Sequence, residues 1–212
     1  MSTTSRRVIV DDTDPAITYT GPWFSEQDSS SLNSLGEFGP PYLGTLHGTN
    51  SSASFSYSFN GMYITPIFLE SKTPIIIYIG TAVSIYGTNQ LADFLLTYPS
   101  CQCIIDGVAV QPPDGILVAE NGQLFCAMHG LSDEPHVITV NATVYNQQTF
   151  WFDYILYSPS PSMSLAQVSL AIYGWDPQLQ YGTGWISSDE NIGNVTMQTG
   201  STFSFEFEGN FH

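Results

Sequence analysis

The chain has 212 residues, of which 19 are Asp or Glu and only 3 are Lys or Arg, so its formal net charge is −16 and its isoelectric point lies near 4.1. Binding to nucleic acids requires clustered basic side chains, so this composition excludes nucleic acids as partners, and it disfavours anionic membrane surfaces for the same reason. Hydrophobic residues make up 42% of the chain and charged residues 10%, which excludes a disordered protein and predicts one or two globular domains.

The predicted secondary structure is almost entirely β, because apolar and polar residues alternate and helical periodicity is nearly absent. The alternating apolar positions are, in chain order, Phe55, Tyr57 and Phe59, then Val83 and Ile85, then Ile138 and Val140, and finally Phe150, Phe152 and Tyr154. Residues 131–136 form a turn pattern that leads into a strand over 136–144. Many short strands separated by turn residues predict an all-β sandwich.

An internal repeat divides the chain. One pattern of residues occurs twice with the same spacing, first as Asp14-Pro15, Tyr19 and Trp23 and again as Asp176-Pro177, Tyr181 and Trp185. The segment 55–61 likewise recurs as 203–209. A Ser/Pro-rich stretch lies between the two copies. We therefore expect a first module over 8–158, a linker over 159–167 and the incomplete start of a second module over 168–212.

Residues 62–80 interrupt the first module. Without them Asn60-Gly61 would form a turn between two strands, a strong hairpin signal. The segment contains Lys72, the only lysine of the chain, and its end codons can be written as a splice donor and acceptor. We hypothesise that it is a translated intron, and that a similar donor at Gly209-Asn210 truncates the second module. The alternative is a genuine loop insertion with an ordinary end of the chain.

Cysteines and glycosylation motifs bear on the compartment. Cys126 could pair with Cys101 or Cys103, and we favour a Cys103–Cys126 disulfide with Cys101 free. Asn-x-Ser/Thr glycosylation motifs begin at Asn50, Asn141 and Asn194. Both features favour an extracellular or cell-surface protein. Residues 1–14 lack the apolar core of a signal peptide, and no segment has the apolar length of a transmembrane helix.

No pattern in the sequence indicates an enzyme. Esterase nucleophile motifs, metal-binding histidine spacings and phosphate-binding glycine loops are all absent. Ser132, Asp133 and His136 lie within five residues in a turn, which is the wrong arrangement for a catalytic triad. We therefore predict a protein without catalytic residues.

Clustered carboxylates suggest one possible metal site. Asp11, Asp12 and Asp14 offer the oxygen ligands that Ca²⁺ prefers, which gives the hypothesis of a structural calcium ion. The alternative is a solvated start of a strand in which Asp14 supports the turn at Pro15. Asp153 is expected to be a buried hydrogen-bonding residue that orders the last strand of the module.

Aromatic side chains are the candidates for ligand binding. Trp23, Tyr42 and Trp151 lie outside the regular alternation and could stack against the faces of sugar rings. The alternative for each of them is a place in the hydrophobic core, since Trp23 recurs in the repeat as Trp185 and one face of a sandwich strand is always core.

Five motifs carry a resemblance to a known group. They are the segments 10–15, 44–49, 103–107, 130–136 and 150–155. Together they resemble the two-module surface proteins of basidiomycete mushrooms, over nearly the whole chain. Members of that group are mostly uncharacterised. The resemblance implies tandem jelly rolls of the galactose-binding-like type, often followed by one membrane helix.

From this resemblance we expect a non-catalytic cell-surface module that binds glycan or cell-wall polysaccharide. Two alternatives remain open. One is a structural or sensor ectodomain that acts as a protein-interaction spacer without a sugar site, and the other is a relative of carbohydrate-active esterases.

Overall fold

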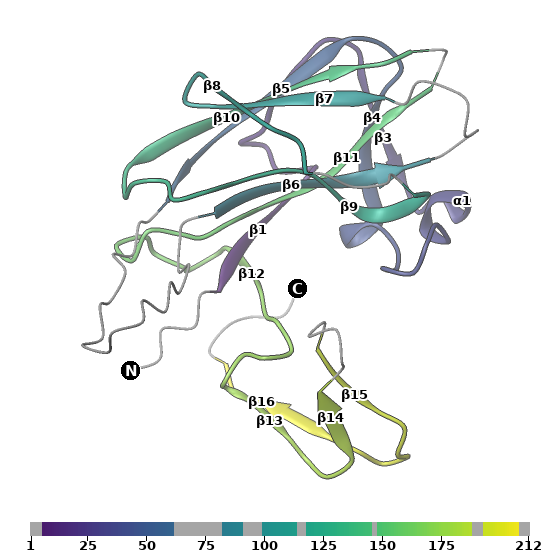
Figure 1. Cartoon of the computed structure of the whole chain (residues 1–212), viewed down its shortest axis with the longest axis vertical. Helices are drawn as coiled ribbons and strands as arrows, with labels where there is room; N and C mark the ends of the chain where they lie inside the picture. The colour runs from purple at the N-terminus through teal and green to yellow at the C-terminus, as the bar shows by residue number, and fades with distance from the viewer. Residues whose placement is uncertain are drawn as a thin grey trace, which may run out of the picture.

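A computed structural model describes residues 6–61, 82–90, 99–113, 118–145, 148–187 and 193–207. The protein is all-β, with 53% strand and 4% helix, and its antiparallel sheets curl and face each other (Figure 1). The predicted all-β class is therefore confirmed, and the two facing sheets are consistent with a β-sandwich.

One sheet has seven strands among the described residues. They are β1 (Arg7–Asp11), β3 (Trp23–Gln27), β4 (Thr45–Thr49), β6 (Ala82–Asn89), β9 (Glu120–His129), β11 (Phe150–Tyr157) and β12 (Ser169–Ala171). Strand β11 is central, because β4 and β1 pair with successive halves of one edge and β6 pairs along the other. Strands β12, β3 and β9 flank β1, β4 and β6 respectively.

The second sheet has five strands in the order β2 (Thr18–Thr20), β5 (Ala53–Asn60), β10 (Pro135–Thr143), β7 (Ser100–Ile105) and β8 (Val108–Val110). From β4 to β7 each strand lies in the other sheet from the strand before it, and the same alternation runs from β9 to β11. The connection between β3 and β4 contains α1 (Ser30–Asn33) and the short 3₁₀ helix η1 (Tyr42–Gly44).

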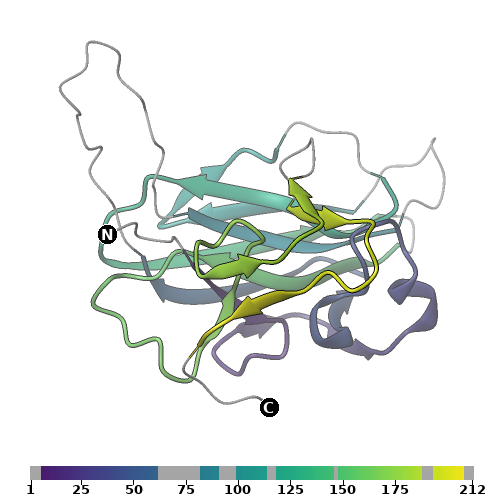
Figure 2. The same ribbon diagram turned by 90° about the horizontal axis from the view of Figure 1, so that it is seen from below.

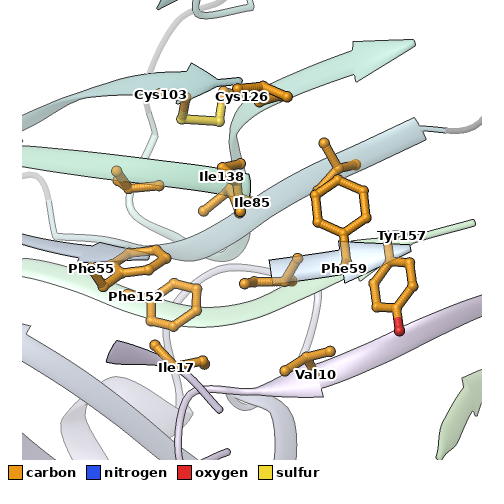
Figure 3. Packing of buried hydrophobic residues seen from close by; sticks show 14 of the residues in the cluster. Val10, Ile17, Phe55, Phe59, Ile85, Cys103, Cys126, Ile138, Phe152 and Tyr157 are labelled. Atoms are coloured by element: carbon orange, nitrogen blue, oxygen red, sulfur yellow. A yellow bond between two sulfur atoms is a disulfide. The ribbon is translucent and has the colours of Figure 1, made fainter. Parts of the chain in front are cut away.

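The core lies between the two sheets and is rich in aromatic rings (Figure 3). Phe55 of β5 stacks on Phe152 of β11 with ring centroids 4.1 Å apart, so the two sheets meet directly at this pair. Ile85, Ile138 and Ile155 are fully buried around it. Burying such a side chain contributes about 1.5–3 kcal/mol, and this term dominates the stability of a chain with so few ionic pairs.

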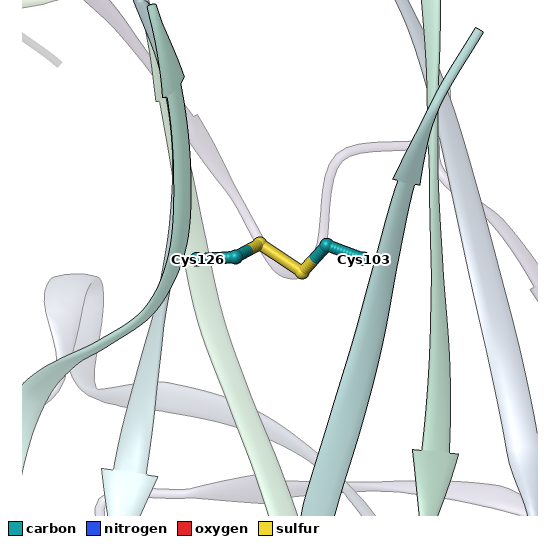
Figure 4. The surroundings of a disulfide bond; sticks show 2 residues. All are labelled: Cys103 and Cys126. Atoms are coloured by element: carbon teal, nitrogen blue, oxygen red, sulfur yellow. A yellow bond between two sulfur atoms is a disulfide. The ribbon is translucent and has the colours of Figure 1, made fainter. Parts of the chain in front are cut away.

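A disulfide joins the sheets as well. Cys103 of β7 and Cys126 of β9 form this bond across the core, with 6.5 Å between their Cα atoms (Figure 4). The predicted pairing is confirmed, and Cys101 is free, as expected. Burial of the Cys101 thiol raises its pKa to about 12, which makes it a poor nucleophile.

The hairpin expected across Gly61 is wrong. Strand β5 pairs with β2 and β10, whereas β6 pairs with β11 and β9, so the two strands belong to opposite sheets. An Asn-Gly pair favours a tight turn only locally, and here the long antiparallel ladder between β5 and β10 determines the pairing. The predicted insertion 62–80 itself lies outside the described residues.

The chain positions that flank this segment are nevertheless close together. The Ser160 amide donates to the carbonyl of Asn60, and the Ser158 amide donates to the carbonyl of Ala82. Gly61 forms an isolated β-bridge with Pro159, between these two bonds. Two residues span at most about 7 Å, so a short connection could join Gly61 to Ala82.

The second copy of the repeat forms two small sheets below the sandwich (Figures 1 and 2). In one of them β13 (Leu179–Tyr181) pairs with β16 (Phe203–Phe205), and in the other β14 (Trp185–Ser187) pairs with β15 (Asn194–Thr196). The first pair repeats β2 and β5 in register, because Tyr19 lies opposite Phe55 and Tyr181 lies opposite Phe203.

Side-chain contacts repeat as well. The hydroxyl of Tyr19 donates to the Asp12 carbonyl and that of Tyr181 to the Gly174 carbonyl, each at 2.6 Å. Trp23 and Trp185 lie 5.2 Å from the respective tyrosine ring. The sequence repeat is therefore also a repeat of local structure.

The two copies meet through equivalent strands. With Asp14 aligned to Asp176, β12 corresponds to the start of β1, and these two strands pair antiparallel around Val8 and Leu170. Leu170 is the repeat counterpart of Val8, so the contact has an approximate two-fold axis. Arg6 adds an ion pair to Asp176 at 2.9 Å, and thus the few basic residues do contribute to the fold.

Candidate functional site

Two groups of side chains stand out, and the first is a buried carboxylate at the end of β1. Asp12 is fully buried and accepts hydrogen bonds from Thr45 Oγ1 at 2.7 Å, and its other oxygen contacts His47 Nδ1 at 2.6 Å. The imidazole of His47 stacks on Tyr19 with centroids 4.4 Å apart. His47 thus lies in β4 and holds the Asp12 carboxylate in place.

Asp153 lies near the same place, on β11. It is 1% exposed and accepts the backbone N–H of Tyr42 at 3.0 Å. Burial raises the pKa of Asp153 to about 8, and the charges of Asp12 and Asp11 add to this rise, while the Tyr42 N–H opposes it. Asp153 is therefore a buried hydrogen-bonding residue on β11, the position that the sequence predicted for it.

The predicted calcium ligands do not act as one group here. Asp14 accepts the Ala16 amide at 2.8 Å and so supports the turn at Pro15. The pKa of Asp11 is raised by burial, and its carboxylate contacts the Thr13 hydroxyl. Across the described ranges no three His, Cys, Asp or Glu side chains gather in an arrangement that could hold a metal ion. The structural calcium ion stays a prediction.

The predicted sugar-binding aromatics pack against protein. Trp151 is 7% exposed, donates its indole N–H to Gln90 and contacts Phe24 edge to face. Trp23 donates to the Ser54 carbonyl and lies against Phe55 and Phe150. These contacts correspond to the core alternative for both tryptophans.

Tyr42 is half-buried. Its ring meets Tyr154 edge to face with centroids 5.9 Å apart, and its backbone is held by Asp153. The structure thus does not bring Trp23, Tyr42 and Trp151 into one common surface site.

The second group of side chains surrounds Trp175, in the second copy of the repeat. Its indole is 63% exposed and stacks nearly parallel on Tyr173, with centroids 4.8 Å apart. Tyr173 therefore packs against the ring while most of the Trp175 side chain stays exposed. Trp175 also borders a pocket of about 380 Å³ that is lined by Gly174, Trp175, Ser187, Gly193 and Asn194.

A comparison of the two copies explains the pocket. Gly174 is the repeat counterpart of Asp12, and Asn194 is the counterpart of His47, because β14 and β15 pair as β3 and β4 do. In the first copy these two larger side chains fill the space with their own contact. In the second copy the Asn194 amide instead donates to the Gly174 carbonyl at 3.1 Å.

Trp175 is not among the predicted site residues, although the sequence repeat contains a signal for it. The repeat counterpart of Trp175 is Thr13, whereas Trp185 has Trp23 as its counterpart. A tryptophan that the other copy does not need for its core is a candidate for a surface role.

The predicted turn at 131–136 has a structural explanation. His136 Nδ1 contacts Asp106 at 2.6 Å and its Nε2 contacts the Ser132 carbonyl, while the Ser132 hydroxyl bonds to Glu134. Burial lowers the pKa of His136, but the Ser132 carbonyl and the Asp106 carboxylate outweigh burial and raise it. These contacts tie the start of β10 to the turn after β7.

The three glycosylation motifs lie in different surroundings. Asn50 is exposed and accepts the Thr149 hydroxyl at 2.6 Å. Asn141 is partly buried within β10. Asn194 lines the pocket, so a glycan attached there would compete with any ligand of the pocket. Among the described residues no helix is long and apolar enough to cross a membrane, and the disulfide suggests an oxidising compartment.

Comparison with known proteins adds no relative. The chain matches no protein-family model, and no curated protein or solved structure matches it significantly.

Proposed function

We propose that this chain is a non-catalytic, extracellular carbohydrate-binding protein whose sugar site is the Trp175 pocket. One observation carries the proposal, namely a largely exposed indole that lines a pocket together with the amide of Asn194 and the hydroxyl of Ser187. Aromatic faces bind the C–H faces of sugar rings, and a few polar groups fix the hydroxyls. A volume of about 380 Å³ accommodates one or two sugar residues.

The charge of the chain narrows the class of glycan. A net charge of −16 repels acidic polysaccharides, so neutral polymers such as those of a cell wall fit best. Asn194 and Ser187 offer an amide and a hydroxyl to sugar hydroxyl groups. Asn194 must be unglycosylated for this binding, because an attached glycan would fill the pocket.

The fold that the family resemblance implies is compatible with this function. Strands that alternate between two facing sheets are the arrangement of a jelly roll. We infer that the first copy is a galactose-binding-like jelly roll and that the setting is the surface of a fungal cell.

Protection of Trp175 from oxidation tests the site without a mutation. The other three tryptophans are partly or fully buried, so N-bromosuccinimide should oxidise Trp175 first. A glycan array run with unglycosylated protein identifies the ligand, and that ligand should slow the oxidation of Trp175, read by mass spectrometry. A glycan that binds while Trp175 oxidises at an unchanged rate would move the site elsewhere.

A spacer or sensor ectodomain is the second candidate, and the contact between β1 and β12 favours it. Equivalent strands of the two copies join into one sheet, which is a way to build a rigid rod from tandem modules. If no glycan on the array binds, this candidate replaces the first.

A further inference from the structure

Three differences between the two copies of the repeat meet at the Trp175 pocket. The counterparts of Asp12, Thr13 and His47 are Gly174, Trp175 and Asn194 respectively. Gly174 leaves space, Trp175 supplies a largely exposed aromatic ring, and Asn194 supplies an amide that belongs to an Asn-Val-Thr glycosylation motif. The pocket therefore contains both a surface that suits a sugar and a point at which the cell can attach one.

The acceptor atom of this motif lies at the wall of the pocket. Asn194 Nδ2 donates to the Gly174 carbonyl at 3.1 Å, and Gly174 directly precedes Trp175 in the chain. A sugar attached to Nδ2 starts one covalent bond away from this atom, so its first ring begins beside the residues that line the pocket with Asn194. The glycosylated amide keeps one N–H group, which is sufficient for its bond to the Gly174 carbonyl.

We propose that an N-glycan on Asn194 is the occupant of the Trp175 pocket, and that its first N-acetylglucosamine packs against the indole and closes the pocket to other glycans. The glycan comes from a lipid-linked diphosphate oligosaccharide, the donor for N-glycosylation in the secretory pathway. The bond between C1 of the sugar and Nδ2 of Asn194 forms while the bond between C1 and the diphosphate oxygen breaks. The amide loses one proton, and the lipid diphosphate leaves.

Covalent attachment strengthens the contact between the sugar and the indole. A free sugar loses translational freedom when it binds, whereas an attached sugar has already lost it. Its effective concentration at the pocket is on the order of millimolar or higher. The first sugars of an N-glycan are uncharged, so the net charge of −16 does not oppose their binding. The pocket volume of about 380 Å³ accommodates one or two of them.

Oxidation of Trp175 by N-bromosuccinimide, read by mass spectrometry, tests this packing on the full chain. The chain is secreted from a eukaryotic host behind an added secretion signal, with Ser52→Ala and Thr143→Ala, so that Asn194 carries the only glycosylation motif left. A lectin column separates the molecules that carry the glycan from those that do not. Both forms have the same sequence, so they differ only in the glycan.

A matched control places the glycan elsewhere on the chain. It carries Thr143→Ala and Thr196→Ala, which leave the motif at Asn50, an exposed residue of the first copy. This control separates packing in the pocket from a general effect of glycan bulk.

We expect Trp175 to be oxidised about fivefold or more slowly in molecules that carry the glycan on Asn194 than in those that do not. Trimming the glycan to its first sugar should preserve this protection, and a glycan on Asn50 should give none. Equal oxidation of Trp175 in the two forms overturns the proposal. An Asn194 that stays unoccupied in a wild-type chain whose Asn50 is glycosylated also overturns it.

The closure of the pocket rests on the sugar site proposed above, whereas the packing against Trp175 does not. A glycan ligand from the array should bind the molecules that carry the Asn194 glycan about tenfold or more weakly than those that do not. Equal binding of that ligand by both forms overturns the closure. Protection of Trp175 without any ligand on the array would support the packing and refute only the proposed function.

Discussion

Asp153→Asn should make the protein more stable, and more so at high pH. Asp153 is buried beside Asp11 and Asp12, and its pKa is raised to about 8. The folded state thus holds this proton more tightly than the unfolded chain, whose Asp pKa is near 3.9. Stability therefore falls as the pH rises from about 4 towards about 8. An asparagine carries no charge, and its oxygen can still accept the Tyr42 N–H.

The expected size of this stability difference follows from the raised pKa of Asp153. A rise from 3.8 to about 8 is about four pH units, which corresponds to an upper limit of about 5–6 kcal/mol for ionising Asp153 in the fold. Relaxation around a buried charge reduces such penalties. We expect the free energy of unfolding of Asp153→Asn to exceed that of wild type by about 2–4 kcal/mol more at pH 8.5 than at pH 5.

Urea unfolding, followed by tryptophan fluorescence at both pH values, measures this difference. Asp133→Asn, at an exposed turn residue, is the matched control and should change the stability little at either pH. If Asp153→Asn destabilises the protein equally at both pH values, the carboxylate is needed in its charged form. That result would show that burial does not penalise the charge of Asp153.

Three further predictions follow from the fold. Deleting residues 62–80 should leave the sandwich folded and stabilise it by up to about 2 kcal/mol in urea unfolding, because the backbones of Asn60 and Ala82 are both bonded to the segment 158–160 and the connection between them becomes shorter. Loss of cooperative unfolding would show that the fold needs the deleted segment. Replacing Cys103 and Cys126 together by alanine should cost about 3 kcal/mol, since their bond closes a loop with a sequence separation of 23, and reduced wild type should show a similar loss. Asp106→Asn should lower the pKa of His136 in an NMR titration, because the Asp106 carboxylate helps to raise it. The raised pKa stabilises the fold below about pH 6, and this contribution is lost as the pH rises through the pKa of His136 in the folded protein. An unchanged pKa of His136 would contradict its contact with Asp106.

The strands of the core could be predicted from sequence because local alternation is enough to place them. Phe55, Tyr57 and Phe59 alternate with serine, and the segment is β5. Cys103 and Cys126 were paired correctly, and they join opposite sheets. The pairing of these strands could not be predicted in the same way. The turn at Asn60-Gly61 suggested a hairpin, but pairing depends on ladders between residues that are distant in sequence.

The candidate site was harder to predict, because exposure depends on tertiary contacts. Trp23 and Trp151 look like surface aromatics in the sequence, and their burial comes from Phe150 and Phe24 on other strands. Trp175 was overlooked because its surroundings resemble an ordinary turn. The sequence repeat aligns Gly174 with Asp12, but the alignment of Asn194 with His47 and the pocket beside them become visible only in the structure.

Whether the Trp175 pocket is the sugar site is decided by the binding of neutral glycans to wild type and to Trp175→Ala. The dissociation constant for the best ligand of the array is measured by calorimetry on unglycosylated protein, with Phe38→Ala as the control for an exposed aromatic residue of the first copy. We expect Trp175→Ala to weaken binding by roughly 30-fold, which corresponds to a loss of about 2 kcal/mol of binding free energy for removing the aromatic ring, while Phe38→Ala binds as wild type does. A Trp175→Ala protein that folds and binds its glycan with unchanged affinity would show that the Trp175 pocket is not the sugar site.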